Sequence, residues 1–504
     1  MEQPREVVVL GAGFSKAVHE AFPLIGELAE KVAARLTKDG VDHPLLRELE
    51  ARLEAEQAQL GASTPPGSAV AEGSLTFETW LSRLAEDQPH LDASERFERR
   101  ALFSKAARAI REVLVEAEER AFRGTLPSWA YQFVRLLDIR RTTVLTLNYD
   151  LLVERLAEAA VWVPPRPSSN VGVIPGRELL PEDIFCGLPP CSPPHAWQQT
   201  NYGCVAPVIT TDEPASSFRL LKLHGSVGWF AAADDPTGLS LAHWRNTHAE
   251  GSEEQREERR RRELPGREPF IVPPATNKSG YLLNPVIREI WQSARRELEN
   301  AKRVVLVGYS LPLGDATFAG LLAETLGSRK ATECRVEVVD LDPERVVEHL
   351  TRLGIDQDCV SVHEGNDALE RWVTSQVEAE ATEVVKTLAA SLTAPRVSAG
   401  ANVVATAHWK RERGGSGPSV RLPGCMEGNT LVLKVQSPNS LTASEPTTVS
   451  QFLNQLSAAT RLDIGLILND GTRARRPVVR ASLQAVNPTK TVDLYPMTTP
   501  EDWR

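Results

Sequence analysis

The stretch Val7-Val8-Val9-Leu10-Gly11-Ala12-Gly13-Phe14-Ser15 decides the fold class of this chain of 504 residues. Its first four residues are apolar and mostly β-branched, which predicts a buried strand of a parallel sheet. The glycines that follow predict a tight turn into a helix, where backbone amides can approach a phosphate. Because Lys16 stands where the third glycine of a G-x-G-x-x-G motif would be, this turn alone is a weak indication of a nucleotide site.

The chain then repeats the pattern of a short apolar strand followed by a helix. The further strands that we predict are Thr142–Leu147, Phe218–Leu223, Arg303–Val307, Arg335–Val339 and a shorter one near residues 359–362. Strands that alternate with helices form right-handed β-α-β units, and these build a parallel sheet. The sequence therefore predicts an α/β fold.

Polar side chains follow the second and third of these strands. In parallel sheets, ligands bind beyond the carboxyl ends of the strands, so these positions are candidate site residues. Asn148 and Asp150 could form an Asx turn that caps the next helix, or could direct an amide and a carboxylate at a ligand. His224 could be a hydrogen-bonded core histidine or a general base.

The fourth and fifth strands of the predicted sheet end in a similar way. Gly308-Tyr309-Ser310 offers a second turn whose backbone can approach a phosphate. Asp340 or Asp342 stands where an acidic residue commonly binds a ribose hydroxyl of a dinucleotide. Each feature alone has an ordinary structural explanation, but their ordered combination favours a binding site.

The charge is distributed unevenly along the chain. The formal net charge is −10, so the overall field does not attract nucleic acid. Residues 371–504 nevertheless carry +4, from 15 basic and 11 acidic residues, which leaves −14 for residues 1–370. The basic runs Lys410-Arg411-x-Arg413 and Arg473-x-Arg475-Arg476 are either a solubility or domain-docking feature or a contact for an anionic trigger or partner protein.

The chain changes character after about residue 395. We predict a helical linker over residues 371–395 and a small β-rich or α+β domain over residues 396–504, with a helix near 448–458 and a turn at Gly414–Pro418. This domain is the candidate sensor or partner-docking part. Its predicted strands are Val403–His408, Thr430–Val435, Leu462–Leu468 and Val478–Leu483.

Composition argues against several other classes of protein. Six cysteines are too few for a disulfide scaffold, and Cys186, Cys191 and Cys204 form no C-x-x-C pair, so we expect no metal site. No apolar run approaches the roughly 20 residues that cross a bilayer. The first residues also lack signal-peptide features, so we expect a cytoplasmic location. The mixed-sign charge run over residues 250–263 predicts a solvated helix or loop.

Four motifs in order resemble the sirtuin superfamily, and more closely the sirtuin-like NADase domains of bacterial anti-phage defence systems. The four blocks are Gly11–Ser15, Thr146–Asp150, Lys222–Ser226 and Gly308–Ser310. Phe77-Glu78 and the context of Tyr309–Pro312 with Asp315 also fit that branch. The resemblance spans about residues 5–370 and implies a Rossmann-like sheet that binds NAD+, with a helical insertion lobe at about residues 24–137.

The resemblance also implies roles for single residues. The turn Gly11-Ala12-Gly13 and Ser15 would contact the diphosphate of NAD+. Asn148 would orient the nicotinamide ribose or the attacking water, and Asp150 would hold the carboxamide. His224 would be the general base. Gly308 and Ser310 would support the phosphate, and Asp340 or Asp342 the adenosine ribose.

One departure bears on the reaction. Protein-deacylating sirtuins carry a four-cysteine zinc ribbon, and this sequence has none. The resemblance therefore implies an NAD+ hydrolase that releases nicotinamide and ADP-ribose and depletes NAD+ in abortive infection. The alternatives are an NAD-dependent deacylase or ADP-ribosyltransferase, and a non-catalytic NAD-binding module. The implied partners are further copies of the chain or a defence protein such as an ATPase, an Argonaute or a sensor.

Overall fold

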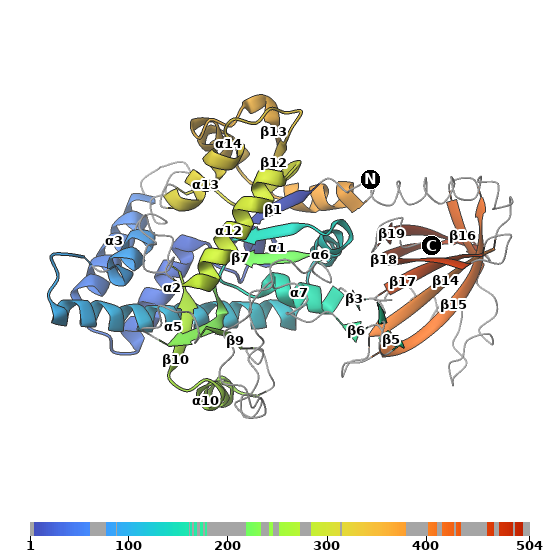
Figure 1. Ribbon diagram of the computed structural model, residues 1–504. Helices are drawn as coiled ribbons and strands as arrows, with labels where there is room; N and C mark the ends of the chain where they lie inside the picture. The colour runs from blue at the N-terminus through green and yellow to red at the C-terminus, as the bar shows by residue number, and fades with distance from the viewer. Residues whose placement is uncertain are drawn as a thin grey trace.

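A six-stranded parallel sheet forms the centre of the chain in the computed structural model (Figure 1). The structure describes residues 5–60, 77–86, 88–160, 218–232, 241–244, 251–272, 284–312, 315–377 and 379, four short strands between 162 and 178, and six strands between 402 and 496. The sheet strands are β1 (Glu6–Leu10), β2 (Thr143–Thr146), β7 (Arg219–Lys222), β11 (Arg303–Val307), β12 (Arg335–Asp340) and β13 (Val360–Glu364). The predicted α/β fold is confirmed, and all six predicted strands are present.

The order of the strands determines where a ligand can bind. Across the sheet they run β13-β12-β11-β1-β2-β7, so the chain moves outward from β1 first to one side and then to the other. Leu10, the last residue of β1, lies between Thr146 of β2 and Val307 of β11. Sheets with this order bind ligands at the switch point, beyond the carboxyl ends of the two central strands. The glycine turn that ends β1 occupies that place.

Helices cover both faces of the sheet. In β1, Val8 and Leu10 belong to one buried cluster and Val7 and Val9 to another, as the alternation of side chains in a strand requires. On the first face pack α1 (Ala12–Val18), α6 (Ser128–Arg140), α7 (Leu152–Ala160) and the helix of residues 368–377. On the second face pack α12 (Pro285–Asn300), α13 (Ala316–Leu326) and α14 (Pro343–Arg352).

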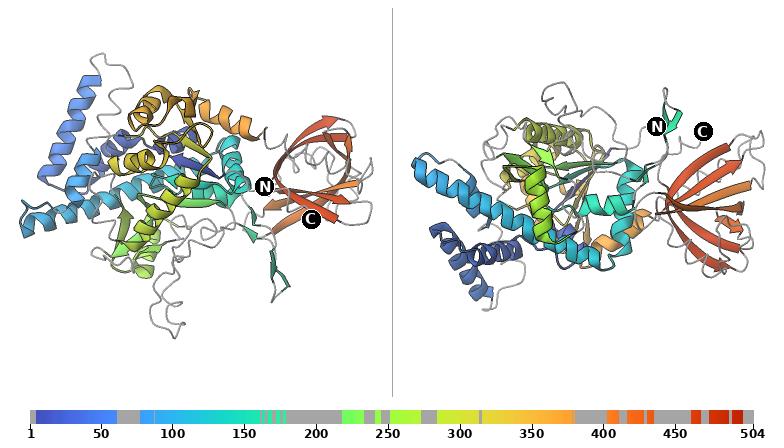
Figure 2. Two further views of the ribbon diagram at one scale, coloured as in Figure 1. Left: turned by 45° about the horizontal axis from the view of Figure 1, so that its top comes forward. Right: turned by 90° about the horizontal axis from the view of Figure 1, so that it is seen from below.

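The segment between β1 and β2 is helical and has a core of its own. It contains α2 (Ile25–Lys38), α3 (Pro44–Leu60), the helix of residues 77–85 and α5 (Ala93–Arg123). Asp92 begins α5 with a capping box, in which its carboxylate accepts from the Glu95 amide. The two views in Figure 2 show α5 running along the body of the molecule, with α2 packed against it. Phe77 and Trp80 are fully buried in this core, together with Tyr149 at the end of β2.

A small antiparallel sheet follows β7 and was not predicted. It consists of β8 (Gly225–Ala232), β9 (Ala242–His243) and β10 (Arg267–Ile271). Gly225 has a φ of +76°, and a Cβ atom there would collide with the carbonyl oxygen of Phe270, so this turn requires glycine. The charge run forms α10 (Glu253–Glu263), as predicted, and Arg256 of α10 pairs with Glu119 of α5.

The C-terminal strands form a closed antiparallel barrel in the order β14-β15-β16-β19-β18-β17. The predicted strands correspond to β14, β16, β17 and β18, whereas β15 and β19 were missed. The prediction of a turn at Gly414–Pro418 was wrong in part, because Ser416, Gly417 and Pro418 lie within β15. The expected helix near 448–458 and most of the expected linker lie outside the described residues. The bounds are β14 (Asn402–Lys410), β15 (Ser416–Glu427), β16 (Thr430–Lys434), β17 (Arg461–Ile467), β18 (Arg473–Val486) and β19 (Thr489–Pro496).

Two short hairpin-like pairs lie between α7 and β7. In one, β3 (Trp162–Val163) pairs with β6 (Arg177–Glu178); in the other, β4 (Arg166–Ser168) pairs with β5 (Gly172–Ile174). Cys186, Cys191 and Cys204 lie outside the described residues. No helix in the described part of the chain is long and apolar enough to span a bilayer.

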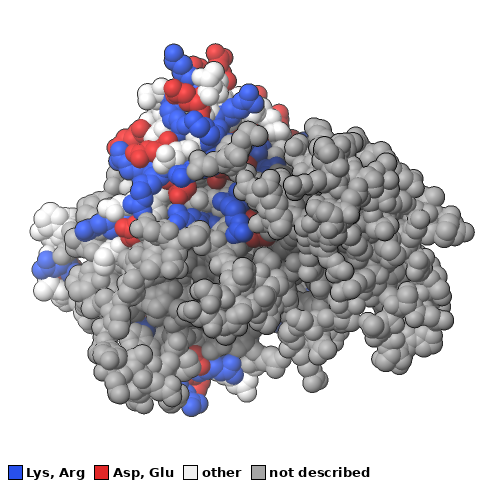
Figure 3. Space-filling view, turned by 45° about the vertical axis from the view of Figure 1, so that its right-hand side comes forward, with Lys and Arg blue, Asp and Glu red and all other residues white. Residues whose placement is uncertain are grey.

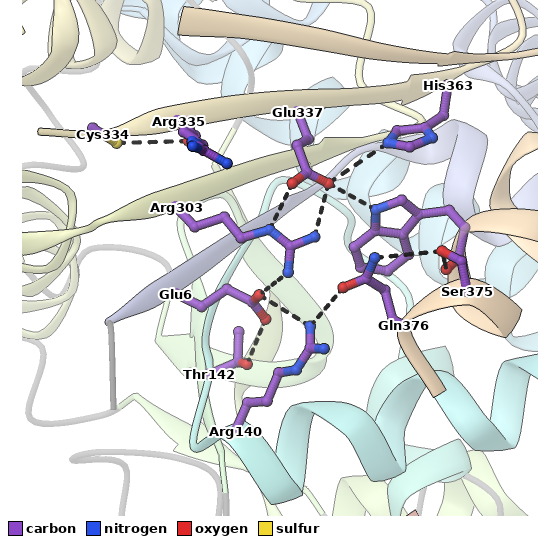
Figure 4. Close-up of polar contacts among 11 residues, drawn as sticks. Glu6, Arg140, Thr142, Arg303, Cys334, Arg335, Glu337, His363, Ser375 and Gln376 are labelled. Carbon is purple, nitrogen blue, oxygen red and sulfur yellow. Dashed lines mark hydrogen bonds and ion pairs between the residues drawn. The ribbon is translucent and has the colours of Figure 1, made fainter. Parts of the chain in front are cut away.

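A network of ion pairs closes the amino ends of the central strands (Figure 4). Arg303 at the start of β11 contacts Glu6 of β1 at 2.6 Å. It also donates to both carboxylate oxygens of Glu337 on β12, at 2.7 and 2.8 Å. Trp372 donates its indole N–H to Glu337 at 2.9 Å, which ties the helix of residues 368–377 to the sheet. We call this the amino-end network; Arg140, Thr142, His363 and Gln376 complete it.

Charges of both signs are intermixed on the surface near this network. Figure 3 shows lysine and arginine beside aspartate and glutamate over the described part of one face, at the top of the view, where α14 and β13 lie. The basic runs near residues 410 and 473–476 belong to the part of the chain whose side chains the structure does not describe.

Candidate functional site

The turn after β1 and the turn after β11 are packed directly against each other. The Gly11 amide donates to the carbonyl of Val307 at 3.1 Å, and the Gly13 amide donates to that of Gly308 at 2.9 Å. A Cβ atom on Gly11 would lie 2.5 Å from the Gly308 oxygen, and one on Gly13 would lie 2.8 Å from the Gly308 Cα. Gly308 has a φ of +56°. These glycines therefore have a structural function in letting two turns meet at the switch point.

Asn148 joins the first turn to the end of β2. Its side-chain nitrogen donates to the Gly11 carbonyl at 2.9 Å and to the Ser15 hydroxyl at 3.1 Å, while its backbone amide donates to the Thr146 hydroxyl. Ser15 in turn donates to Asp150 at 2.7 Å. We call Gly11, Gly13, Ser15, Asn148, Asp150 and Gly308 the glycine–asparagine cluster. The structure thus brings together the predicted residues from three of the four sequence blocks.

Buried charged residues pack against this cluster and fix Asp150 in place. Burial raises the pKa of Asp150 to about 6; Lys222 and the Ser15 hydroxyl oppose the shift, and Glu118 adds to it. Lys222 is only 1% exposed; it contacts Glu154 at 2.9 Å and also donates to the backbone carbonyl of Asp150. Burial also raises the pKa of Glu154, against the opposing effect of Lys222. Asp150 is therefore held by the fold, and its carboxylate fixes the Ser15 hydroxyl that Asn148 contacts.

The remaining block, Lys222–Ser226, contributes His224 to a second group of residues, the histidine cluster of His224, Tyr309 and Asp315. The Nε2 atom of His224 lies 3.3 Å from Oδ2 of Asp315, and the Tyr309 hydroxyl donates to the same oxygen at 3.3 Å. All three side chains are buried. Burial and the nearby carboxylates of Asp315 and Glu78 raise the pKa of Tyr309 well above its usual value, so the phenol stays protonated and can donate.

Aromatic rings enclose His224. The Tyr149 ring lies 6.4 Å from the imidazole and the Trp291 ring 6.5 Å, both tilted toward it. The Trp291 indole donates to the backbone carbonyl of Leu223, and the His224 carbonyl accepts from the Val272 amide. The backbone of His224 is thus fixed on both sides.

The two clusters are continuous through the loop after β11. A Cβ atom on Gly11 would also contact Tyr309, the residue that donates to Asp315. Leu311, two residues further on, is buried with a φ of +51°, a conformation that leucine rarely adopts. His349 of α14 contacts the Leu311 carbonyl at 3.0 Å and holds the loop there. Local backbone strain of this kind is concentrated at functional sites.

The remaining predicted residues surround these clusters. Ser310 is exposed on the loop after β11. Asp340 ends β12, one residue after Val339, whose carbonyl accepts from the Gly308 amide. Burial raises the pKa of Asp340, and its carboxylate accepts from the Asp342 amide at 3.1 Å, whereas Asp342 itself is exposed. Of the two acids that the sequence left open, Asp340 is the one that lies beside the Gly308 turn.

Sequence reasoning missed the buried charges and gave Asp315 no role. The available signal for Lys222 was its position inside an apolar predicted strand. A lysine that is fully buried there must have a partner, because unpaired lysines are almost never fully buried. Nothing local marked Glu118, which reaches the site from α5 and accepts from the Leu151 amide at 2.6 Å. In the described part of the chain no group of three histidine, cysteine or acidic residues could hold a metal ion.

Comparison with known proteins adds no assignment to this geometry. No protein-family model matches the chain, and no curated protein matches it either.

Proposed function

We propose that this protein is an NAD+ hydrolase that cleaves the bond between nicotinamide and ribose. The observation that carries the proposal is the position of the two clusters: a glycine turn, an oriented asparagine and a buried histidine–aspartate pair meet beyond the carboxyl ends of β1, β2, β7 and β11. Sheets with this strand order bind dinucleotides at that place. The order of the four motifs, which resembles sirtuin-like NADases, supports the same reaction.

The reaction needs a held substrate and an activated water. Nicotinamide leaves with the bonding electron pair, positive charge develops on the ribose ring, and the water oxygen bonds to the anomeric carbon. The products are nicotinamide, ADP-ribose and one proton. We assign His224 as the base that accepts this proton. A general base of this kind typically contributes about 10²–10⁴-fold to the rate.

Asn148 is assigned to the nucleophile or to the ribose. Its amide nitrogen is committed to Gly11 and Ser15, so the direction of its side-chain oxygen is fixed. A fixed acceptor can orient a water or a ribose hydroxyl without losing rotational freedom on binding, which is how positioning lowers a barrier. Asp150 acts one step behind, since it holds Ser15 in the orientation that Asn148 requires.

The direct test is incubation of the purified chain with NAD+ alone, followed by chromatography of nicotinamide and ADP-ribose. We expect turnover without any acyl-peptide, and its loss by about 10²–10⁴-fold in His224→Ala, with a similar loss in Asn148→Ala. His90→Ala is the matched control, because His90 is exposed on the helical segment between β1 and β2. Turnover by His224→Ala at the wild-type rate would refute the assignment of the base.

The biological part of the proposal is depletion of NAD+ during abortive infection by phage. It rests on the resemblance of the four motifs to those of sirtuin-like NADases. We expect cells that express the chain with its neighbouring genes to lose NAD+ after phage infection, and cells with Asn148→Ala to keep it. Binding of NAD+ without turnover, in infected cells as in the purified protein, would instead support a non-catalytic module.

A further inference from the structure

Asp315 is more closely engaged with His224 than a helix cap requires. As the cap of α13, its Oδ1 accepts from the Phe318 amide at 3.4 Å. Its other oxygen, Oδ2, lies 3.3 Å from His224 Nε2 and accepts from the Tyr309 hydroxyl at the same distance. A serine or asparagine would cap the helix equally well. A carboxylate at a site that is 1% exposed is costly to bury unless it is paired.

The chemistry of the pair determines which imidazole nitrogen can act. An ionised carboxylate only accepts hydrogen bonds, so beside ionised Asp315 the imidazole carries its proton on Nε2. The lone pair of a neutral imidazole then lies on Nδ1. If Nδ1 takes up a proton, the negative charge of Asp315 stabilises the resulting imidazolium, as an aspartate does for the histidine of a hydrolase triad.

We infer that Asp315 is the positioning residue of His224: it fixes the Nε2–H tautomer, leaves Nδ1 as the base, and stabilises the protonated ring. The inference rests on the proposed function for its catalytic meaning, although the tautomer itself does not depend on it. It adds a residue from α13 to a site whose base comes from the end of β7.

Other groups around the imidazole are less suited to this function. The titratable side chains that face it include Asp315, Tyr309 and Tyr149, with Glu78 beyond Tyr309. The Tyr309 phenol is kept neutral by its surroundings, and the Tyr149 hydroxyl donates to the Val272 carbonyl. Trp291 packs against the ring without charge. Asp315 is therefore the acidic residue in direct contact with the imidazole.

The kinetic test compares Asp315→Asn with Tyr309→Phe across pH. The amide keeps the shape and the cap but removes the charge, so we expect kcat to fall by about 10–100-fold while KM for NAD+ changes by less than about 3-fold. The acidic limb of the pH–rate profile should move to lower pH, because the protonated ring loses its counter-charge. Tyr309→Phe should leave the position of that limb unchanged. A profile of Asp315→Asn that superimposes on the wild type would overturn the inference.

Two controls separate this function from stability. Asp356→Asn makes the same acid-to-amide change at an exposed cap far along the chain, where Asp356 accepts from the Asp358 amide; it should behave as wild type. Asp315→Thr retains a capping oxygen without charge, so it should reproduce the kinetic defect of Asp315→Asn even if the latter folds poorly.

A measurement on the resting protein distinguishes failure of the inference from failure of the proposed function. Ring ¹⁵N shifts of histidine-labelled protein, with His224→Gln used for assignment, report which nitrogen carries the proton. We expect the Nε2–H form in the wild type and a mixture of tautomers in Asp315→Asn. An Nδ1–H form in the wild type would refute the inference whether or not the protein hydrolyses NAD+. The Nε2–H form in a protein without turnover would refute the proposed function alone.

Discussion

The two ends of the central sheet use buried charge in opposite ways. At the amino ends, Arg303 lies between Glu6 and Glu337, and each carboxylate has a cation within 2.7 Å. Burial alone would raise the pKa of Glu337, but hydrogen bonds from Arg303 and Trp372 outweigh it and lower the pKa. At the carboxyl ends, burial dominates instead, and the pKa of Asp150 is raised to about 6. Similar residues are thus stabilised as ions at one end and disfavoured as ions at the other.

This difference follows from what each end has to do. The amino ends only need to hold three strands and the helix of residues 368–377 together, so complete pairing is the best arrangement there. A reaction site must instead keep polar groups ready for a substrate, and this readiness costs stability in the free protein. Asp150, whose ionised form burial disfavours, and the left-handed Leu311 lie at the carboxyl ends, where we place the reaction. The contrast is therefore consistent with the proposed function and can be measured separately from it.

The largest expected change in stability is at the amino ends. Arg303→Ala removes the guanidinium that bridges Glu6 and Glu337, which are mostly buried, and breaking such a pair typically costs about 3–5 kcal/mol. We expect this loss in urea unfolding, with NAD+ turnover per folded molecule retained. The control is Arg295→Ala, whose pairs with Glu299 and Glu324 lie at the surface and should contribute nothing measurable. Equal urea midpoints for Arg303→Ala and Arg295→Ala would contradict the claim that the amino-end network stabilises the fold.

The fold was largely predictable because hydrophobic period and strand-end residues are local signals. Val7–Leu10 and Arg303–Val307 are short apolar runs bounded by glycine, and both are central strands. The signals failed where tertiary context decides. Gly225–Ala232 forms β8 although it begins at a glycine with positive φ, and β15 includes Gly417 and Pro418 because it is closed into a barrel by its neighbours.

The candidate site was predictable only in part, for a related reason. Residues directly after strands, such as Asn148 and His224, are recognisable from chain position alone. Their partners are not, because Asp315 and Lys222 acquire meaning only when distant segments meet. The sequence predicted that Gly11 and Gly13 form a tight turn whose backbone can approach a phosphate, and the structure adds that each allows the Gly308 turn to approach.

That approach gives the second prediction. Gly308→Ala places a Cβ against the Phe14 amide at a φ of +56°, so left-handed strain and overlap should together cost about 2–4 kcal/mol. NAD+ turnover should fall as well, because Tyr309 follows directly. Gly320→Ala is the matched control, since Gly320 lies in α13 with nothing within 4 Å of the added methyl group. That variant should be slightly stabilised, by roughly 0.5–1 kcal/mol. If both variants unfold at the same urea concentration, the two turns do not depend on glycine for their contact.

The smallest expected effect tests the charge contrast itself. The pKa of Asp150 is about 6 in the folded protein and 3.8 in an ordinary setting, so between these values the folded state binds more protons than the unfolded state. Stability should therefore fall as pH rises through this window. Asp150→Asn cannot titrate, so relative to this variant the wild type should lose about 2 kcal/mol between pH 4 and pH 7. The measurement is the difference in unfolding free energy between the two proteins at several pH values.

At the amino ends the sign is reversed. The pKa of Glu337 is lowered, so its contribution to stability is present above its ordinary pKa and is lost on acidification. The difference in unfolding free energy between the wild type and Glu337→Gln should therefore have the opposite slope with pH. If these differences change with pH in the same direction for Asp150→Asn and Glu337→Gln, burial and pairing do not shift carboxylate pKa values in opposite directions at the two ends of the sheet.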